Sequence, residues 1–331
     1  MEEKLLALIR LARNRRASDI HFIRRGNSLE ISLRQPDGLV QLQQDIFDAS
    51  LLEYLKYRMG LDLTRLHSPQ SGSGALAGTD CRFAFLPAQD METGVLRLMQ
   101  ADAALHIQDL SSDPAVTEFF YKLAGQTKGL VLFVGPTGSG KTTTLHAILR
   151  EASLVHDLKC VSLEDPIEIP DPSYVQISID EDNGLTYERG IEELMRHDPD
   201  VICIQEVRTP SAAARLFTAA FTGHFVLATI HAGSGRECLW RLRDLGIGEE
   251  LIREQLDAVI SQRLYPAAEE RGVSENKKEV CLHEIIKKPE ILHLLDKGVY
   301  PPGFRRLEDI VHQAASDGSI RAEDAARDFP R

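Results

Sequence analysis

The chain has 331 residues, of which 43% are hydrophobic and 27% charged, and its formal net charge at pH 7 is −12. This composition is that of a globular protein with a sizeable core and about two domains. The acidic total argues against a protein whose main surface binds nucleic acid, and the lack of an apolar run of about 18 residues argues against a membrane-spanning helix.

The first part of the chain predicts a small α+β domain. Residues 2–16 place apolar side chains on one helical face, and a second helical stretch covers about 48–60. The glycine-rich segment 68–78 predicts a loop. Apolar runs, some of them bounded by turn sequences such as RGN and PDG, predict strands at 20–24, 28–34, 38–42, 81–86 and 94–99. Strands with a helix beside them are typical of an α+β domain.

Beyond residue 129 the pattern changes to that of an α/β domain. Apolar runs that alternate with amphipathic helical stretches predict strands at 129–134, 159–163, 201–204 and 225–230. Such alternation is typical of a doubly wound, mostly parallel sheet. Residues 237–265 predict helix again, and the charged chain after 266 is expected to form a helical tail.

The two parts are joined by a turn-rich segment, DLSSDP at 109–114. This segment predicts a hinge or the start of a helix capped by Ser111 or Ser112. We therefore divide the chain into an N-terminal α+β domain, 1–108, a linker, 109–128, and an α/β domain with a helical tail, 129–331.

The stretch GPTGSGKTTT, residues 135–144, fits the phosphate-loop pattern G-x-x-x-x-G-K-[ST] and stands between a predicted strand and a predicted helix. The backbone N–H groups of such a loop and the helix N-terminus bind phosphates. Lys141 is expected to reach the β- and γ-phosphates, and the Thr142 hydroxyl to bind Mg²⁺. An ordinary glycine-rich turn is the weaker interpretation. The expected ATP-binding residues are Gly135, Pro136, Thr137, Gly138, Ser139, Gly140, Lys141, Thr142 and Thr143.

Carboxylates follow two of the predicted core strands. Glu164 comes directly after the run 159–163, and Glu206 closely follows the run 201–204. An acid at the carboxyl end of a core strand is where a Walker B residue faces Mg²⁺. Either acid alone would more often be a helix cap or a surface charge, but the phosphate loop upstream favours a functional role for both.

Two histidines flank the run 225–230. His231 follows it, at the edge of the sheet where ligands gather, so a contact with the γ-phosphate is expected. His224 precedes the run, and an ordinary polar role suffices for it.

Together these segments resemble the secretion ATPase superfamily, the motors of type II secretion, type IV pili and competence pseudopili. GPTGSGKTTT, SLEDPIE, RHDPDVICIQEVR and GHFVLATIHAGS resemble, in order and spacing, its Walker A, Asp box, Walker B and His box. ASDIHF, PQSG, CRFAFLP, VLRLM and SQRLYP extend the resemblance over roughly residues 15–266. The resemblance implies a RecA-like P-loop domain preceded by the smaller α+β domain.

The resemblance also implies roles for single residues. Glu164 would polarise the attacking water and Glu206 would hold Mg²⁺ through water, although these two assignments could be exchanged. His231 would sense the γ-phosphate. Arg82 and Arg97 would be swung by the N-terminal domain onto the triphosphate; without the resemblance, they would be interpreted as strand arginines paired with surface acids.

The chain departs from the family pattern in places. Gln205 stands where many members have glycine, Thr209 where they often have aspartate, and AGSGRE after His231 differs from the usual wording. The sequence shows no tetra-cysteine zinc module like that of many type II secretion members, and their long N-terminal domain is not expected here. The chain is therefore most similar to the competence type. Retraction motors of type IV pili are similarly short and stay as the alternative. The segment PPGFRRLEDIVHQAASDGSI does not resemble their C-terminal region, which favours the competence type.

The expected protein is a homo-hexameric ATPase that converts ATP hydrolysis into domain rotation and drives a membrane platform protein of a pilus or secretion apparatus. Scattered cysteines without a C-x-x-C pair and an acidic N-terminus favour a cytoplasmic protein, attached to the membrane only through that partner. No direct contact with nucleic acid is expected. A nucleic-acid motor would need a basic channel and stacking aromatics, and a non-hydrolysing scaffold would not need Glu164 and Glu206.

Overall fold

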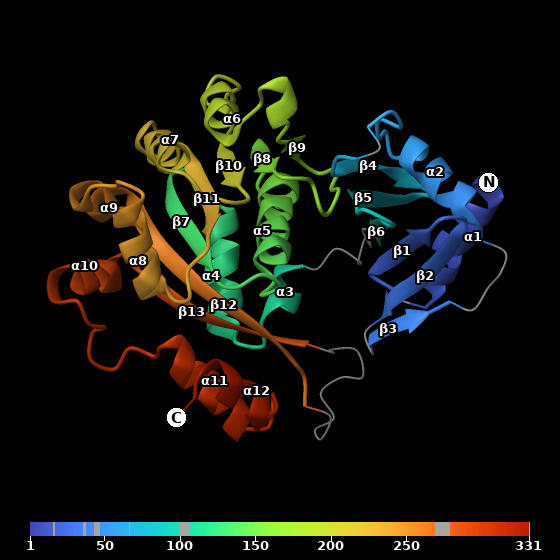
Figure 1. The fold of residues 1–331 in the computed structure, drawn as a ribbon. Coiled ribbons are helices and arrows are strands. Elements are labelled where there is room, and N and C mark those ends of the chain that lie inside the picture. The colour runs from blue at the N-terminus through green and yellow to red at the C-terminus, as the bar shows by residue number, and fades with distance from the viewer. Residues whose placement is uncertain are drawn as a thin grey trace. The chain divides into compact units, whose positions relative to one another are not determined.

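The structure is a computed structural model that describes residues 1–15, 17–35, 38–42, 47–65, 67–98, 106–268 and 279–330. The chain forms two compact units, Met1–Ala103 and Ala104–Arg331 (Figure 1). Parts of the predicted elements lie outside the described residues, namely Arg16, Pro36, Asp37 and Met99, as do 269–278 and 331 of the predicted tail. Within the described ranges, no helix combines the length and apolarity needed to cross a bilayer.

The first unit is an antiparallel sheet with two helices. Its strands follow the order β3-β2-β1-β6-β5-β4, and each neighbouring pair is antiparallel. The elements are α1 (Glu2–Asn14), β1 (Asp19–Arg25), β2 (Ser28–Gln35), β3 (Gly38–Gln41), α2 (Ala49–Arg58), β4 (Gln70–Leu76), β5 (Thr79–Pro87) and β6 (Glu92–Leu98).

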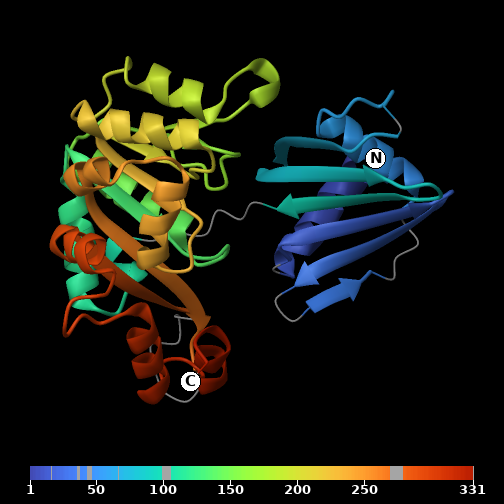
Figure 2. The same ribbon diagram turned by 60° about the vertical axis from the view of Figure 1, so that its left-hand side comes forward.

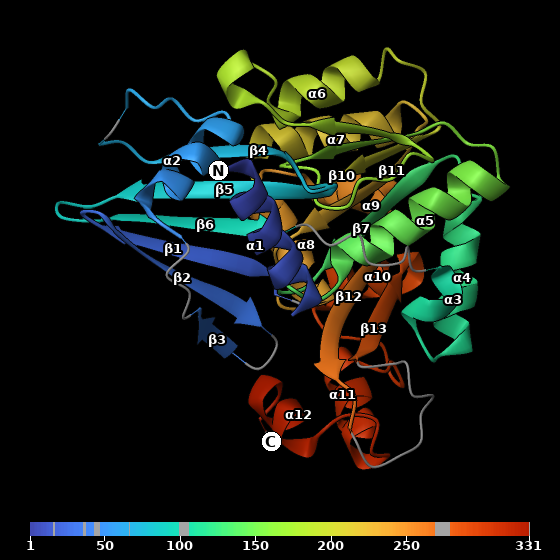
Figure 3. The same ribbon diagram turned by 90° about the vertical axis from the view of Figure 1, so that its right-hand side faces the viewer.

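Both helices cover the same face of this sheet. The apolar side chains of α1 and α2, such as Leu8 and Leu52, pack with Phe22 and Phe83 of the strands in one buried cluster. Figure 3 shows the face that the helices cover, and Figure 2 shows the open face. The sheet has one apolar and one open face because successive side chains of a strand point to opposite sides, as the alternating sequence pattern predicts.

The segment 68–78 is not a loop as predicted, because most of it forms the edge strand β4. Its glycine and serine residues carry no apolar pattern, and among its residues only Leu76 is buried. Backbone pairing with β5 holds it in the sheet. A Cβ atom on Gly72 would lie 1.9 Å from the Met59 carbonyl oxygen, so glycine permits this close approach to the end of α2.

The second unit contains a mostly parallel sheet in the order β13-β12-β7-β11-β10-β8-β9, in which only the β12–β13 pair is antiparallel among the described strands. Its strands are β7 (Gly129–Val134), β8 (Cys160–Glu164), β9 (Val175–Ser178), β10 (Val201–Ile204), β11 (Phe225–Ile230), β12 (Leu256–Pro266) and β13 (Glu279–Lys287). Its helices are α3 (Ile107–Leu110), α4 (Pro114–Ala124), α5 (Lys141–Val155), a 3₁₀ turn (Glu181–Asn183), α6 (Tyr187–Leu194), α7 (Pro210–Phe221), α8 (Gly235–Asp244), α9 (Glu249–Gln255), α10 (Lys288–Lys297), α11 (Leu307–Ser316) and α12 (Ala322–Asp328).

Helices cover both faces of this sheet. Buried residues of α6 to α10 form one cluster with the strands, and those of α3, α4 and α5 form another on the opposite face (Figures 1 and 3). A smaller cluster joins α11 and α12 to Tyr265 of β12. This doubly wound arrangement confirms the fold class predicted from the sequence.

Three predicted strands, β7, β10 and β11, have the predicted bounds, and β8 is displaced by one residue. The prediction of helix over 237–265 is wrong for its last part, because α9 ends at Gln255 and β12 follows. A strand buried on both faces is apolar nearly throughout, so its period does not separate it from a buried helix.

The segment 109–128, predicted as a linker, lies within the second unit. It contains α4, whose Phe120 and Leu123 are buried in the same cluster as residues of α5. The cap of α4 is neither Ser111 nor Ser112: the Asp113 carboxylate accepts a hydrogen bond from the Ala115 N–H at 2.9 Å. An aspartate one residue before the helix fills this role equally well.

Candidate active site

The phosphate loop joins β7 to α5 in a conformation that requires glycine. Gly138 and Gly140 have φ angles of 78° and 84°, in the left-handed region that glycine adopts without strain. A Cβ atom on Gly135 would lie 2.5 Å from the Gln262 carbonyl oxygen. The loop therefore lies directly against β12 and leads its backbone into the N-terminus of α5, which begins at Lys141 and favours anions.

The amide side chain of Gln262 holds this loop from β12. Its Nε2 donates to the Ser139 carbonyl oxygen at 2.7 Å, and its Oε1 accepts a hydrogen bond from the Thr144 hydroxyl at 3.1 Å. Gln262 is only 1% exposed. No local pattern marks this role, because Ser261 and Arg263 flank Gln262 and its partners Thr144 and Ser139 are 118 and 123 positions away.

Lys141 folds back over the loop. Its Nζ donates to the carbonyl oxygens of Gly135 and Pro136 at 2.9 and 2.8 Å. Burial lowers the pKa of Lys141, and the negative charge of Glu206 opposes this shift. The remaining predicted loop residues are placed as follows: Pro136, Thr137 and Gly138 are exposed, Ser139 is buried, and Thr142 and Thr143 are half-buried in the first turn of α5.

Glu164 ends β8 and is 2% exposed. Its Oε1 accepts hydrogen bonds from the Ser162 hydroxyl at 2.6 Å and from the Gln176 amide at 2.9 Å. Its Oε2 has no hydrogen-bond partner among the described residues. An unpartnered, buried carboxylate oxygen is costly, and such groups are typical of sites that bind water, ions or substrate.

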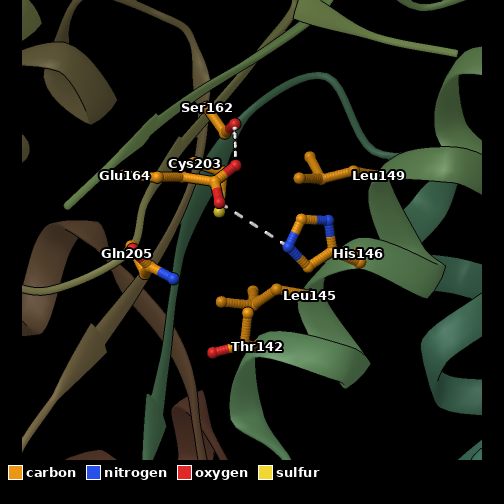
Figure 4. A pocket seen from close by; sticks show the side chains of 8 residues that line it. All are labelled: Thr142, Leu145, His146, Leu149, Ser162, Glu164, Cys203 and Gln205. Carbon is orange, nitrogen blue, oxygen red and sulfur yellow. Dashed lines mark hydrogen bonds and ion pairs between the residues drawn. The ribbon is translucent and has the colours of Figure 1, made fainter. Parts of the chain in front are cut away.

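The carboxylate of Glu164 lines a small pocket beside α5 (Figure 4). One side is formed by α5, and the other by the ends of β8 and β10. The lining residues are Thr142, Leu145, His146, Leu149, Ser162, Glu164, Cys203 and Gln205. The fold thus brings the predicted magnesium ligand Thr142 and the predicted catalytic Glu164 to one pocket.

Glu206 and His231 lie beyond the carboxyl ends of two neighbouring parallel strands, β10 and β11. Their side chains meet, with His231 Nε2 3.0 Å from Glu206 Oε1. Arg208, which the sequence analysis did not assign, donates to the other carboxylate oxygen at 2.5 Å. Burial alone would raise the pKa of Glu206, but the Arg208 hydrogen bond and the positive charges of His231, Arg208 and Lys141 hold it below its usual range.

Arg82 and Arg97 lie on the sheet of the first unit, directly opposite each other in the pairing of β5 with β6. Arg97 Nε donates to Asp19 Oδ1 at 2.8 Å. Burial raises the pKa of Asp19, but hydrogen bonds from Ser18 and Arg97 outweigh this and lower it. Arg82 is exposed and has no ion pair with any described residue. Two arginines in a cross-strand pair repel each other, which favours an anion beside them.

His224, which directly precedes β11, makes ordinary polar contacts, as the sequence favours. Its Nδ1 lies 3.1 Å from the Ala219 carbonyl oxygen and 3.2 Å from the Thr222 hydroxyl. These contacts join the start of β11 to the end of α7. Of the two histidines that flank β11, it is His231 that contacts Glu206.

Comparison with known proteins identifies the family of this chain. The type II/IV secretion system protein family matches residues 1–291. The chain belongs to this family. This confirms the resemblance found in the sequence and the prediction that the protein is an ATPase. The names of the relatives associate the family with type II secretion, type IV pili and competence.

Two relatives illustrate the match. Over 255 residues the chain is 35% identical to the competence protein ComGA of Halalkalibacterium halodurans, covering 75% of this chain and 73% of the relative. Over 307 residues it is 36% identical to the protein transport protein HofB homolog of Escherichia coli, covering 90% of this chain and 63% of that protein. The chain thus matches less than two thirds of the HofB homolog.

The fold is also that of a solved structure. The pilus retraction motor PilT with bound ADP superposes with a TM-score of 0.79 at 22% identity, over 99% of this chain and 97% of PilT. At this identity the likeness establishes the fold alone, and it agrees with the predicted P-loop ATPase architecture.

The contact between Gln262 and the phosphate loop can be tested by Gln262→Leu. Because the substitution removes the amide's hydrogen bonds to the Ser139 carbonyl and the Thr144 hydroxyl in a buried place, we expect a loss of about 1–3 kcal/mol in the free energy of unfolding. We also expect weaker binding of a fluorescent ADP analogue, measured by titration. Gln313→Leu on α11, where the side chain is exposed, is the control. Unchanged stability and binding for Gln262→Leu would contradict the conclusion that the Gln262 amide holds the phosphate loop.

Proposed function

We propose that the chain is the subunit of an ATP-hydrolysing motor that powers assembly of a competence pseudopilus or a related type II secretion or type IV pilus apparatus. The observation that carries this proposal is the convergence of a phosphate loop with Glu164, Glu206 and His231 beyond the carboxyl ends of adjacent parallel strands. Binding sites in open α/β sheets lie at this edge.

The residues of this edge fit a nucleoside triphosphate with Mg²⁺. The loop offers glycine-shaped backbone beside a helix N-terminus and the Lys141 amine, which suits phosphates. Mg²⁺ prefers hard oxygen ligands, and Thr142 and Glu206 supply a hydroxyl and a carboxylate. When bound, Mg²⁺ offsets the negative charge of the phosphates. Thr142 and, through water, Glu206 would hold it.

Hydrogen bonding at the two carboxylates supports one assignment of their roles. Both oxygens of Glu206 already have side-chain partners, Arg208 and His231, whereas Oε2 of Glu164 has no hydrogen-bond partner among the described residues. A general base needs a free, ionised oxygen that faces the reacting water. We therefore assign Glu164 to activation of the attacking water and Glu206 to Mg²⁺, with His231 positioned to sense the γ-phosphate.

The first unit would supply positive charge to the transition state. Arg82 and Arg97 present two guanidinium groups in adjacent strands, and arginine is well suited to phosphate. In the proposed cycle, movement of the N-terminal unit brings them to the triphosphate, and hydrolysis releases them. A homo-hexameric ring of such subunits, acting on a membrane platform protein at the cytoplasmic face, would convert this movement into mechanical work.

Assembly is favoured over retraction by the names of the relatives. ComGA is a competence protein, and the chain is 33% identical over 288 residues to the type IV pilus assembly ATPase PilB of Thermus thermophilus. The likeness to the retraction motor PilT is one of fold. A nucleic-acid motor with the same core stays the alternative of another class, and stimulation of hydrolysis by single-stranded DNA would favour it.

Lys141→Ala should abolish turnover. Loss of one preorganised charge at the phosphates costs about 10²–10³ in rate, so release of inorganic phosphate from ATP should fall by at least about a hundredfold. Lys122→Ala, an exposed residue of α4 paired with Glu118, is the matched control and should leave the rate unchanged. A Lys141 variant that hydrolyses ATP at the normal rate would refute the site.

Arg82→Ala should lower kcat more than it weakens nucleotide binding. Since arginine acts on charge that develops in the transition state, we expect kcat to fall roughly tenfold to a hundredfold while Arg97 remains. Arg25→Ala, in the same sheet and paired with Glu30, serves as the control. Steady-state kinetics and a binding titration separate the two effects, and unchanged values in both would make Arg82 a surface residue only.

The ring should be visible in solution. With a non-hydrolysable ATP analogue, sedimentation should show a particle several-fold heavier than the 36.9 kDa chain, because the proposed motor is a closed ring of identical subunits. The same run without nucleotide gives the reference. A strict monomer at micromolar protein with nucleotide would argue against the motor.

A further inference from the structure

His146 is a buried histidine that faces the free oxygen of Glu164. It lies on α5, one helical turn beyond Thr142, so both side chains reach the same pocket (Figure 4). Its Nε2 is 3.8 Å from Glu164 Oε2. Neither His146 nor its partner Tyr174 belongs to the motifs that the sequence predicts to be functional.

Tyr174 decides which ring nitrogen of His146 carries the hydrogen. The Tyr174 hydroxyl is hydrogen-bonded to His146 Nδ1. Burial raises the pKa of Tyr174 far above its usual range, so the phenol keeps its proton. That proton has no other acceptor among the described residues, so the hydroxyl donates to Nδ1. A neutral imidazole that accepts at Nδ1 must carry its hydrogen on Nε2.

The surroundings of His146 keep the ring neutral and direct it to Glu164. Burial lowers the pKa of His146, against the charges of Glu164 and Asp171. Asp171 has its own partner, Arg150, at 3.7 Å. The rest of the pocket near the ring is formed by Leu145, Leu149 and Cys203, and burial raises the pKa of the Cys203 thiol, which keeps that group neutral.

We propose that His146, oriented by Tyr174, is a positioning residue for Glu164. This inference rests on the proposed role of Glu164 as the base that activates water. Ser162 and Gln176 hold Oε1, and the Nε2–H of His146 is the donor on the side of Oε2. A shift of about 0.8 Å would bring the pair to the usual hydrogen-bond distance.

The consequence is a carboxylate fixed in orientation from both sides. Each carboxylate oxygen has two lone pairs, so Oε2 can accept a hydrogen bond from His146 and still accept a proton from the attacking water. Because His146 is neutral and its hydrogen already faces Glu164, it does not compete for that proton. His146 is therefore a positioning residue, which acts through Glu164 and does not itself accept the proton.

The kinetic test compares His146→Leu with His146→Gln. Leucine removes the donor, and we expect kcat to fall about tenfold, the effect of one hydrogen bond to a charged group, with KM unchanged. Glutamine places an amide N–H near the position of Nε2, so it should restore most of kcat. His156→Leu, at the exposed end of α5, is the matched control. If His146→Gln is as impaired as His146→Leu, the donor role is wrong.

Tyr174→Phe tests the link between the two side chains. It should lower kcat in the wild-type background but have no further effect when combined with His146→Leu, because Tyr174 acts only through His146. Additive effects would overturn the inference. If His146→Leu does not fold, as judged by its melting transition, the same cycle is run with His146→Met, which also lacks the N–H donor.

A measurement without turnover tests the tautomer directly. In ¹⁵N-labelled protein the ring nitrogens of His146, assigned by their absence in His146→Gln, should show a protonated Nε2 and an unprotonated Nδ1, and Tyr174→Phe should mix the two tautomers. A protonated Nδ1 in the wild-type protein would overturn the inference.

The outcome for Glu164 separates this inference from the proposed function. If Glu164→Gln hydrolyses ATP at the normal rate, the proposed base is wrong and His146 has nothing to position. If Glu164→Gln is inactive while His146→Leu keeps the wild-type kcat, the proposed function stands and only the positioning role falls.

Discussion

The close approach of β12 to the phosphate loop is the contact on which the rest of the site depends. It requires glycine at position 135, where a Cβ atom would lie 2.5 Å from the Gln262 carbonyl oxygen, and it lets the Gln262 amide hold Ser139. The next residue of the strand, Arg263, donates to the Gly233 carbonyl oxygen at 2.9 Å and lies 3.5 Å from Asp328 of α12. One strand therefore contacts the loop, the segment after His231 and the C-terminal helices.

The sequence predicted the parts of the fold whose signal is local. The run 129–134 is bounded by turn residues and followed by a glycine pattern, so both β7 and the phosphate loop could be recognised. The sequence predicts helix for β12 because a strand buried on both faces is apolar nearly throughout. It predicts a loop for β4 because the glycine and serine residues of this strand show no apolar pattern, and backbone pairing with β5 holds them in the sheet. The role of Gln262 could not be predicted from neighbours in sequence, because its partner Ser139 is 123 positions away.

The departures from the family pattern have structural explanations. Thr209 caps α7, since its hydroxyl accepts a hydrogen bond from the Ala212 N–H at 3.1 Å, a role that aspartate fills as well. Gln205 accepts a hydrogen bond from the Asp165 N–H at 3.0 Å and so joins the ends of β10 and β8. A glycine there would leave that N–H without this partner. Thr209 thus replaces one capping side chain by another, and Gln205 adds a polar contact at this edge of the sheet.

The two strand-end glutamates differ in what surrounds them, and this difference bears on their chemistry. Arg208 and His231 occupy both oxygens of Glu206, and the first of these contacts helps to hold its pKa low, so this carboxylate stays charged and has little freedom to take up a proton. Glu164 is more deeply buried and keeps one oxygen free, facing the pocket that Thr142 lines. Where two acids share a site, such a contrast separates a permanently ionised group from a proton acceptor. The pairing of His146 with Tyr174 extends this contrast, because it adds a neutral donor beside Glu164 where Glu206 has the Arg208 guanidinium.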